Sequence, residues 1–388
     1  AQEASGFALE EVVVTAQKRQ QNLQDIPVSA QAFNSEDIRV MGADSISELI
    51  FAAPSLNAGG LGGSQQRMGI RGIIDYSRNP GVDPRMGIYI DEVYQGQGYS
   101  ADQPLLGLAT VEILRGPQGT LFGKNTVSGA INLVTKQPTD ELEGEIALTY
   151  GNEGQVKAQT YFSGGLADNL FGSLSVAYDE RDGLYDNTFL NEETGDYDRI
   201  STRGKLYWVA TDALDFTLSV DYTKRDSTEP SGTPLALPRF DIQAGQGTDD
   251  QLEFWGVALK ATFEMESGYE LISITSYRDT EYVFDGDDDM QPQLFQQTLF
   301  DEYNDQFTQE LRIQSPAEGD FTWLAGLYYF ETERSTGRSS IIGEDLFAAA
   351  LGPAAAFAAG TAFAPSTVDN TSYAAFFHAD WALSDNLT

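Results

Sequence analysis

The stretch LDFTLSVDY, residues 214–222, decides the fold class. Apolar or aromatic residues occupy every second position, and the positions between them carry acidic or hydroxyl side chains. Successive side chains of a β-strand point to opposite faces, so this stretch predicts a strand with one apolar and one polar face. The predicted apolar face consists of Leu214, Phe216, Leu218, Val220 and Tyr222, and the polar face of Asp215, Thr217, Ser219 and Asp221.

The same alternation recurs along most of the sequence. From residue 142 onward the chain falls into segments of about ten residues, separated by polar stretches rich in Gly, Asp and Asn. Some connections are tight, as near Asp212 and Gly268, whereas 226–251 and 336–370 are long and polar. A soluble β-sandwich or propeller also alternates, but tight turns at one end and long loops at the other are typical of an outer-membrane barrel.

We therefore expect a membrane all-β protein with about ten strands of a transmembrane barrel. An open sheet edge cannot face lipid, because its backbone groups would lack hydrogen-bond partners. The sequence is accordingly interpreted as the N-terminal part of a longer, incomplete barrel.

Composition excludes several classes of function. The formal net charge is −36, from 59 acidic and 23 basic residues, which opposes binding of nucleic acid. The sequence has no cysteine and a single histidine, His378, so thiolate or imidazole metal sites are not expected. No nucleophile with a matching base is visible at usable spacing. We predict that the protein is not an enzyme and carries no cofactor and no resident metal.

The first 137 residues follow a different pattern. Short apolar runs alternate with glycines and turn signals, which is typical of a compact α/β domain. Ser45 followed by Glu48 forms a capping-box pattern that predicts the start of a short amphipathic helix, which Pro54 would end. A small mixed domain is therefore expected ahead of the barrel.

The segment EEVVVTAQKR, residues 10–19, contains a β-branched run with high strand propensity. Acidic residues precede the run, basic residues follow it, and no neighbouring segment is an evident partner. An exposed, unpaired strand invites pairing with another chain. The run predicts either a strand covered by a later part of this chain or a docking point for another protein.

Five ordered blocks resemble the plug domain of the TonB-dependent outer-membrane transporters. They are EVVVTA, DIPVSAQAF, MGIRG, IYIDEVY and VEILRGPQGTLFGKNTVSGAINLVTK, which begin at residues 11, 25, 68, 88 and 111. The resemblance implies a barrel of about 22 strands, with an N-terminal α/β plug domain inside its lumen. It also implies a periplasmic N-terminal segment (residues 1–20), a plug (21–137) and a barrel (138–388).

The resemblance assigns VVVTA to the TonB box, the segment that pairs with the inner-membrane protein TonB. Its residues are Val12, Val13, Val14, Thr15 and Ala16. Recognition by strand addition relies on backbone hydrogen bonds, which a β-branched run is suited to make. The alternative is a plug strand with an ordinary partner inside the domain.

Arg71 and Arg115 lie in apolar, strand-like contexts. A buried guanidinium needs a carboxylate partner. The resemblance implies that both arginines meet glutamates of the barrel wall, in a part of the barrel beyond Thr388, and hold the plug in place. The alternative is two solvated arginines on turns.

Ligand contact in the family falls on the outward-facing apical loops of the plug and on the inner barrel wall. In this sequence the apices are expected at residues 74–85 and 94–100. Their side chains can stack on a polar ligand or hydrogen bond to it, although each is as easily explained as an ordinary turn residue. The candidates are Tyr76, Arg78, Arg85, Gln97 and Tyr99.

Three other patterns suggest sites or elements. Gly123 and Lys124 resemble the end of a phosphate-binding loop, but Asn125 stands where that motif needs Ser or Thr. DGDDDM, residues 285–290, departs from an EF-hand loop, so we expect a solvated acidic loop, with loose binding of a divalent cation left open. The alanine-rich stretch 345–363 predicts a short loop helix.

These features together predict active import across the bacterial outer membrane. By family prevalence, the leading substrate class is a ferric siderophore or another iron complex, and oligosaccharides, cobalamin and aromatic compounds remain open. The rival from another class is a passive porin-like or surface-interaction barrel. Expected partners are TonB with its energising complex, a small-molecule or metal-chelate ligand, and outer-membrane lipid and lipopolysaccharide. Ala1 and Gln2 are natural first residues after signal-peptide cleavage, which predicts export.

Overall fold

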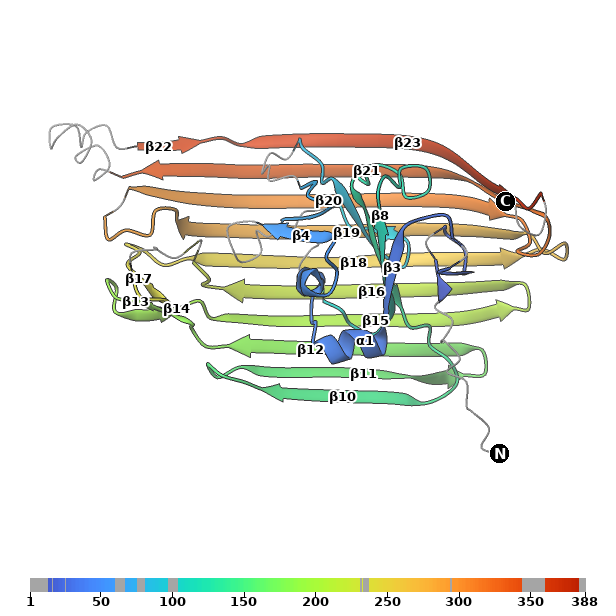
Figure 1. The fold of residues 1–388 in the computed structure, drawn as a ribbon, viewed down its shortest axis with the longest axis horizontal. Coiled ribbons are helices and arrows are strands. Elements are labelled where there is room, and N and C mark those ends of the chain that lie inside the picture. Colours follow the sequence, from blue (N-terminus) through green and yellow to red (C-terminus); the bar gives the residue numbers. More distant parts are fainter. Residues whose placement is uncertain are drawn as a thin grey trace, which may run out of the picture.

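The computed structural model describes residues 13–15, 17–24, 26–59, 67–74, 81–96, 104–230, 232, 237–293, 295–343 and 360–383. Two parts are evident in Figure 1. The long sheet, made of long strands between residues 143 and 381, forms a broad wall. The mixed domain, residues 26–135, contains short strands and two helices and lies across one face of that wall.

The long sheet is an antiparallel meander. Its strands pair in chain order, except that the short β22 and the long β23 both pair with β21. Within the described residues it has ten long strands, as the alternation predicts. Their bounds are β10 (Glu143–Tyr150), β11 (Val156–Ala167), β12 (Leu170–Arg181), β15 (Tyr197–Thr211), β16 (Leu214–Ser227), β18 (Asp249–Glu264), β19 (Glu270–Asp287), β20 (Gln296–Gln314), β21 (Phe321–Ile342) and β23 (Ser366–Trp381), with β22 at Gly360–Phe363.

The two faces of β16 follow the predicted alternation. Leu218 and Val220 are 36% and 46% exposed on the face away from the mixed domain. Thr217 and Ser219 line a cavity on the opposite face, which the mixed domain covers. The apolar face of the long sheet is therefore the lipid-facing side, and the polar face is the lumen side.

This assignment gives a matched pair of substitutions. We expect Leu218→Arg to lower the free energy of unfolding in phospholipid vesicles by about 2–4 kcal/mol if the residue lies near the bilayer midplane, because a guanidinium would face lipid. Ser219→Arg, on the lumen side, should have a small effect. Denaturant titration of both variants measures the difference, and equal effects would contradict the assignment of faces.

The strands are longer than the sequence predicts. β20 has 19 residues and β21 has 22, so much of the predicted loop at 336–370 and part of that at 226–251 is paired strand. Beyond the lipid-facing region both sides of a strand are polar or aromatic, which removes the alternation signal. A buried cluster in these extensions ties β18, β19 and β20 together, and it contains Leu252, Phe254, Tyr282, Phe284 and Phe300. A small sheet of β13 (Tyr185–Asn187), β14 (Glu192–Thr194) and β17 (Asp241–Ile242) stands at the same end.

The mixed domain is built on a five-stranded sheet with the order β3-β8-β9-β6-β7, in which β6 and β9 run parallel. A separate pair, β4 with β5, lies beside it. The bounds are β3 (Ala30–Asn34), β4 (Leu56–Gly59), β5 (Arg67–Ile70), β6 (Met86–Ile90), β7 (Val93–Tyr94), β8 (Leu108–Arg115) and β9 (Gly129–Thr135).

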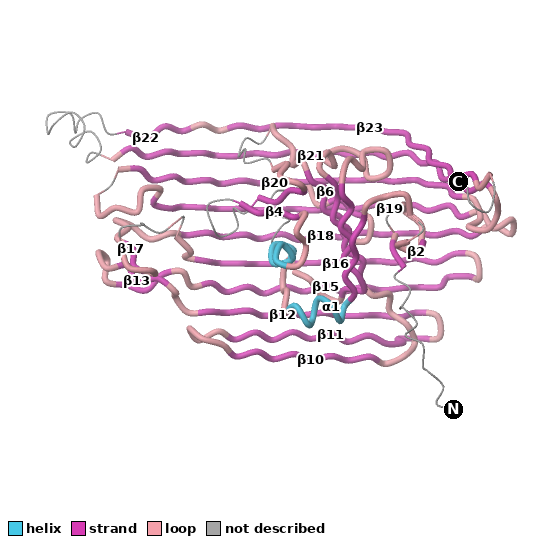
Figure 2. Tube along the Cα trace, in the orientation of Figure 1, coloured by secondary structure: helices cyan, strands magenta, loops and turns pink. Residues whose placement is uncertain are grey.

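Two short helices belong to the mixed domain (Figure 2). The helix α1 (Ser35–Met41) is capped by Asn34, and η1 (Ile46–Phe51) is a 3₁₀ helix with Ser45 at its N-cap. The predicted Ser45–Glu48 capping box is confirmed, since the Glu48 carboxylate accepts the Ser45 N–H at 3.3 Å. The sequence prediction missed α1. In the part of the chain that the structure describes, no helix has the length and apolarity needed to span a membrane.

The two faces of the central strands β8 and β9 have different roles. Val111, Ile113, Ile131 and Leu133 point to one face, are completely buried, and pack with η1 into the domain core. The residues between them face the other way, and two of these are polar and buried, namely Glu112 and Asn132. The strand pairing places Glu112 directly opposite Asn132. The site described next is built around this polar pair.

Candidate functional site

The N-terminal segment, residues 13–24 as far as they are described, forms a small hairpin. β1 (Val13–Val14) pairs antiparallel with β2 (Gln21–Asn22). Val14 is 1% exposed and packs in a cluster that includes Leu114 of the mixed domain and Phe330 of the long sheet. The expectation that no neighbouring segment pairs with this strand is therefore wrong for Val13 and Val14. The turn between β1 and β2 lacks Gly and Asn, which left no hairpin signal in the sequence.

Thr15 anchors this segment to the mixed domain. Its backbone N–H donates to Glu112 Oε1 at 2.6 Å, and its hydroxyl donates to the same oxygen at 3.0 Å. Asn132 Nδ2 donates to Thr15 Oγ1 at 3.0 Å. Burial raises the pKa of Glu112, and the hydrogen bonds from Thr15 and Asn132 act in the opposite direction. One buried carboxyl group thus organises the start of the chain.

Removing that carboxyl group should loosen the segment. We expect Glu112→Ala to speed hydrogen exchange of the Thr15 amide by about 5- to 150-fold, because a buried donor that loses its acceptor costs about 1–3 kcal/mol. Exchange measured by mass spectrometry on peptides covering residues 13–24 tests this. Glu145→Ala, at an exposed position on β10, is the control. Unchanged exchange in Glu112→Ala would show that Glu112 does not anchor the segment.

The same segment also contacts the long sheet. Lys18 Nζ lies 2.6 Å from Glu310 Oε2 on β20, and both side chains are largely buried. The Arg19 guanidinium donates to the carbonyl oxygens of Ser315, at 3.1 Å, and Trp323. The N-terminal segment therefore joins the mixed domain to the wall.

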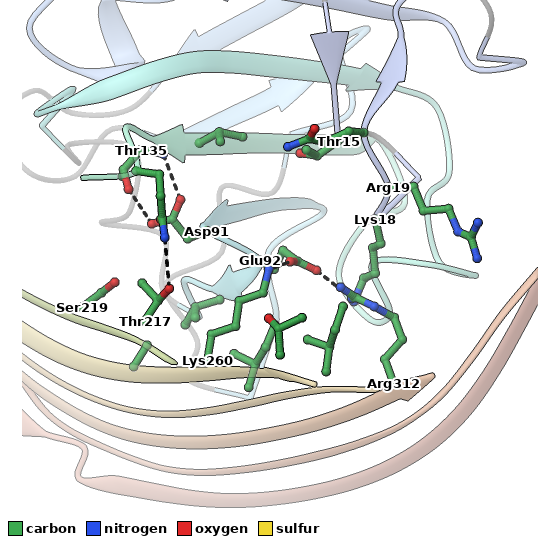
Figure 3. A pocket seen from close by; sticks show the side chains of 18 of the residues that line it. Thr15, Lys18, Arg19, Asp91, Glu92, Thr135, Thr217, Ser219, Lys260 and Arg312 are labelled. Carbon is green, nitrogen blue, oxygen red and sulfur yellow. Dashed lines mark hydrogen bonds and ion pairs between the residues drawn. The ribbon is translucent and has the colours of Figure 1, made fainter. Parts of the chain in front are cut away.

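The turn between β6 and β7 carries the main ion pairs between the mixed domain and the wall. Asp91 and Glu92 occupy this turn with φ values of 47° and 71°, in the left-handed region that non-glycine residues seldom adopt. Asp91 lies 2.9 Å from Lys205 of β15. Glu92 lies 2.6 Å from Arg312 of β20 and 2.7 Å from Lys260 of β18. Two adjacent carboxylates thus meet three cations from three strands. Figure 3 shows Glu92 with two of these cations, Lys260 and Arg312.

These cations set the charge state of the turn. Burial by itself would raise the pKa of both carboxyl groups. Lys205 beside Asp91 and Arg312 beside Glu92 outweigh burial, so both pKa values lie below their usual range. Both groups are therefore ionised at neutral pH.

A cavity of about 720 Å³ separates the Asp91–Glu92 turn from the wall. The N-terminal segment lines one side of it, through Thr15, Lys18 and Arg19. Figure 3 shows Lys260 and Arg312 rising from the wall toward Glu92 across this space. Residues of short connections, among them Gly268 and Pro316, also line it, so the cavity lies toward the short-turn end of the strands.

Comparison with known proteins identifies this arrangement. Residues 22–130 match the family model of the TonB-dependent receptor plug domain. The chain belongs to the TonB-dependent receptor family. The mixed domain is the plug, and the long sheet is part of the barrel wall. TonB-dependent receptors are transporters and receptors and not enzymes, in agreement with the sequence prediction.

Three relatives illustrate the match. The pesticin receptor of Yersinia enterocolitica is 28% identical over 223 residues, which are 52% of this chain and 32% of that receptor. The vitamin B12 transporter BtuB of Photobacterium profundum is 24% identical over 175 residues, 45% of this chain and 28% of the transporter. The crystal structure of the ferric yersiniabactin uptake receptor FyuA from Yersinia pestis superposes with a TM-score of 0.79 at 20% identity, covering 92% of this chain and 54% of FyuA. The matched part of this chain thus spans about a third of the curated pesticin receptor.

The structure places the two predicted plug arginines as follows. Arg71 is exposed in the turn after β5, with a φ of 56°, and not within a strand. Arg115 ends β8, where its guanidinium donates to Ser55 Oγ at 3.1 Å and Gln31 Oε1 at 2.5 Å. Among the described residues, neither arginine forms an ion pair with the wall. Their pairing with carboxylates beyond residue 388 stays a prediction.

Most of the predicted ligand contacts fall outside the described residues. Only Arg85 lies within them, where it is exposed and its carbonyl accepts two hydrogen bonds from Ser128. Neighbouring Asp83 pairs with Arg334 of β21 at 2.8 Å and Lys124 at 3.3 Å, so this loop is also tied to the wall. The candidates outside the described residues are Tyr76, Arg78, Gln97 and Tyr99, together with Val12 and Ala16 of the predicted TonB box.

The acidic stretch 285–290 forms a hydrogen-bonded turn. Asp287 accepts the N–H groups of Gly245, Asp289 and Met290, and Asp289 accepts those of Gln291 and Gln296. No arrangement of acidic, histidine or cysteine residues suited to a metal ion is present in the described ranges. The alanine-rich stretch lies mainly outside them, and its last residues form β22.

Sequence reasoning missed Asp91, Glu92 and their cations. A signal was present, because IYIDEVY places two consecutive carboxylates after a strand-like apolar run. The cations Lys260 and Arg312 each stand at a lumen-facing position of an alternating strand. The alternation therefore predicts that they point inward, but it does not predict their partners.

Proposed function

We propose that this receptor imports a scarce nutrient across the bacterial outer membrane by TonB-dependent active transport. The leading substrate is a ferric siderophore or another iron complex. The supporting observation is the ionic attachment of the plug to the wall, where Glu92 pairs with Lys260 of β18 and Arg312 of β20. A passive porin needs no plug domain attached to its wall, and this argues against a porin-like role.

The proposal includes a site for the energising partner. Val12, Val13, Val14, Thr15 and Ala16 serve as the TonB box, which pairs with TonB by strand addition. In the resting receptor, Val13 and Val14 are paired with β2 and Thr15 is held by Glu112, so the box must leave these contacts to engage TonB. The domain division into residues 1–20, 21–137 and 138–388, and export by a cleaved signal peptide, belong to the same proposal.

The ligand side of the proposal places the substrate on the outward apices of the plug. Tyr76, Arg78, Arg85, Gln97 and Tyr99 are the proposed contacts. Arg71 and Arg115 are proposed to hold the plug through carboxylates elsewhere on the wall. A relative named as a vitamin B12 transporter keeps cobalamin as the second candidate substrate.

Uptake by intact cells tests the proposal. The full-length receptor, expressed in a host that lacks its own iron receptors, is expected to accumulate radiolabelled iron from at least one ferric siderophore of a panel. Accumulation should disappear when TonB is deleted. Uptake of cobalamin alone would support the second substrate, and TonB-independent entry would support a passive barrel.

A further inference from the structure

The cavity between the plug and the wall is unusually cationic for this chain. The chain as a whole has 59 acidic and 23 basic residues. Of the described residues that line the cavity, seven are lysine or arginine and five are aspartate or glutamate. Basic residues therefore outnumber acidic ones in the described lining of this cavity, within a strongly acidic protein.

Most of these charges neutralise one another. Asp91 pairs with Lys205, and Glu92 pairs with Lys260 and Arg312. The remaining close pair is bidentate, with the Arg278 guanidinium 2.8 and 2.9 Å from the Asp221 carboxylate. Lys18 pairs with Glu310, a residue that does not line the cavity.

Two cations in the lining, Arg203 and Arg19, form no direct ion pair with a described carboxylate, although Asp221 interacts electrostatically with Arg203 and Glu270 with Arg19. Arg203 of β15 is 6% exposed, and it donates through Nη1 to the carbonyl oxygen of Leu106 at 2.8 Å. Its Nε has no hydrogen-bond partner within the described structure. Arg19, on the N-terminal segment, donates to the oxygens of Ser315 and Trp323. A buried guanidinium with an unused N–H favours an anionic ligand, since a charge left unpaired in the interior is costly.

We propose that this cavity is a binding site for a small organic anion that carries carboxylate groups, with Arg203 as its principal contact. The volume of about 720 Å³ suits a ligand of small-molecule size. The planar guanidinium of arginine matches the geometry of a carboxylate better than an ammonium group does. The described lining does not include Arg85, the one proposed ligand contact within the described residues, so the cavity is a second site.

The N-terminal segment covers the proposed site. Thr15, Lys18 and Arg19 line the cavity, and the same residues attach the segment to the plug and the wall. Detachment of the segment would uncover the cavity at the short-turn end of the strands. If the proposed import function holds, an anionic substrate would occupy this site on its way out of the receptor. The binding itself does not depend on that function.

Direct binding of citrate to the full-length receptor in detergent micelles tests the inference. We expect saturable binding at one site by calorimetry at low ionic strength, with weaker binding as salt is added, because the contacts are ionic. Glucose, an uncharged solute, should not bind. Arg203→Gln should weaken citrate binding at least about tenfold, and Arg203→Lys should retain more of it.

Arg199→Gln is the matched control, because Arg199 lies on the same strand and the same face but pairs with Asp179 away from the cavity. It should leave citrate binding unchanged. Absence of saturable citrate binding, or equal losses in the two Gln variants, would overturn the inference. Heat-modifiable migration in gel electrophoresis confirms that each variant is folded. Citrate binding without TonB-dependent uptake would refute only the proposed function, and uptake without citrate binding would refute only this site.

Discussion

Val13→Pro should abolish energised uptake while ligand binding at the outer face survives. Proline removes a backbone N–H and fixes φ, so it interrupts the ladder of hydrogen bonds on which strand addition depends. Val13 is 48% exposed, so the substitution does not open the core. Uptake of labelled substrate is expected to fall to the level of a strain without TonB.

Val13→Ala is the control for this experiment, because it keeps the N–H and removes only an exposed side chain. Its uptake should stay close to that of the unaltered receptor. Ligand affinity, measured on purified receptor, should be the same for both variants. Loss of ligand binding in Val13→Pro would indicate a misfolded plug, and normal uptake would exclude this segment as the TonB box.

Arg312→Met should loosen the attachment of the plug to the wall. Arg312 is 1% exposed and lies 2.6 Å from both Glu92 and Glu310. Its removal leaves one or both carboxylates buried with reduced compensation, and breaking such a pair typically costs about 3–5 kcal/mol. Hydrogen exchange of the β6 and β7 amides in the full-length receptor should accelerate accordingly.

Lys224→Met is the control, since Lys224 is exposed and its pair with Asp226 contributes little. Adding Glu92→Gln to Arg312→Met should recover part of the protection, because it removes one unpaired charge. The depressed pKa values of Asp91 and Glu92 determine how the attachment of the plug to the wall depends on pH. The two carboxylates stabilise the attachment fully above about pH 4, near the ordinary carboxyl pKa, and this stabilisation is lost as the pH falls further. Unchanged exchange in Arg312→Met would exclude Arg312 as an anchor of the plug.

The sequence predicts the barrel wall better than it predicts the plug contacts. Strand alternation is a local property, and the burial of one face repeats every two residues, so Leu218 and Ser219 could be assigned to opposite faces. The strand ends could not be assigned, because β20 and β21 continue where neither face meets lipid. The Ser45–Glu48 box is likewise local, and it fixed the start of η1.

The plug contacts depend on residues that are far apart in the chain. Glu92 and Arg312 are 220 positions apart, and no local pattern relates them. The turn itself was also unpredictable, since Asp-Glu is not the Asn-Gly or Asp-Gly pair that usually adopts positive φ at both positions. Arg71 and Arg115 stand in recognisable blocks of sequence, but so do Asp91 and Glu92, and of these four residues only the two carboxylates form ion pairs with described residues of the wall.

The order of the attachments along the N-terminal segment determines how tension would travel through the receptor. A pull on the N-terminal end would first load Val13 and Val14, which pair with β2, and then Thr15, through which it would enter the plug sheet at Glu112 and Asn132 of its two central strands. Lys18 and Arg19 come next, and they pass the load to the rigid wall. The contacts of the N-terminal segment would therefore break one after another. Each step would require only the work of breaking a few contacts. A strong resting attachment and a low peak force are compatible in this geometry.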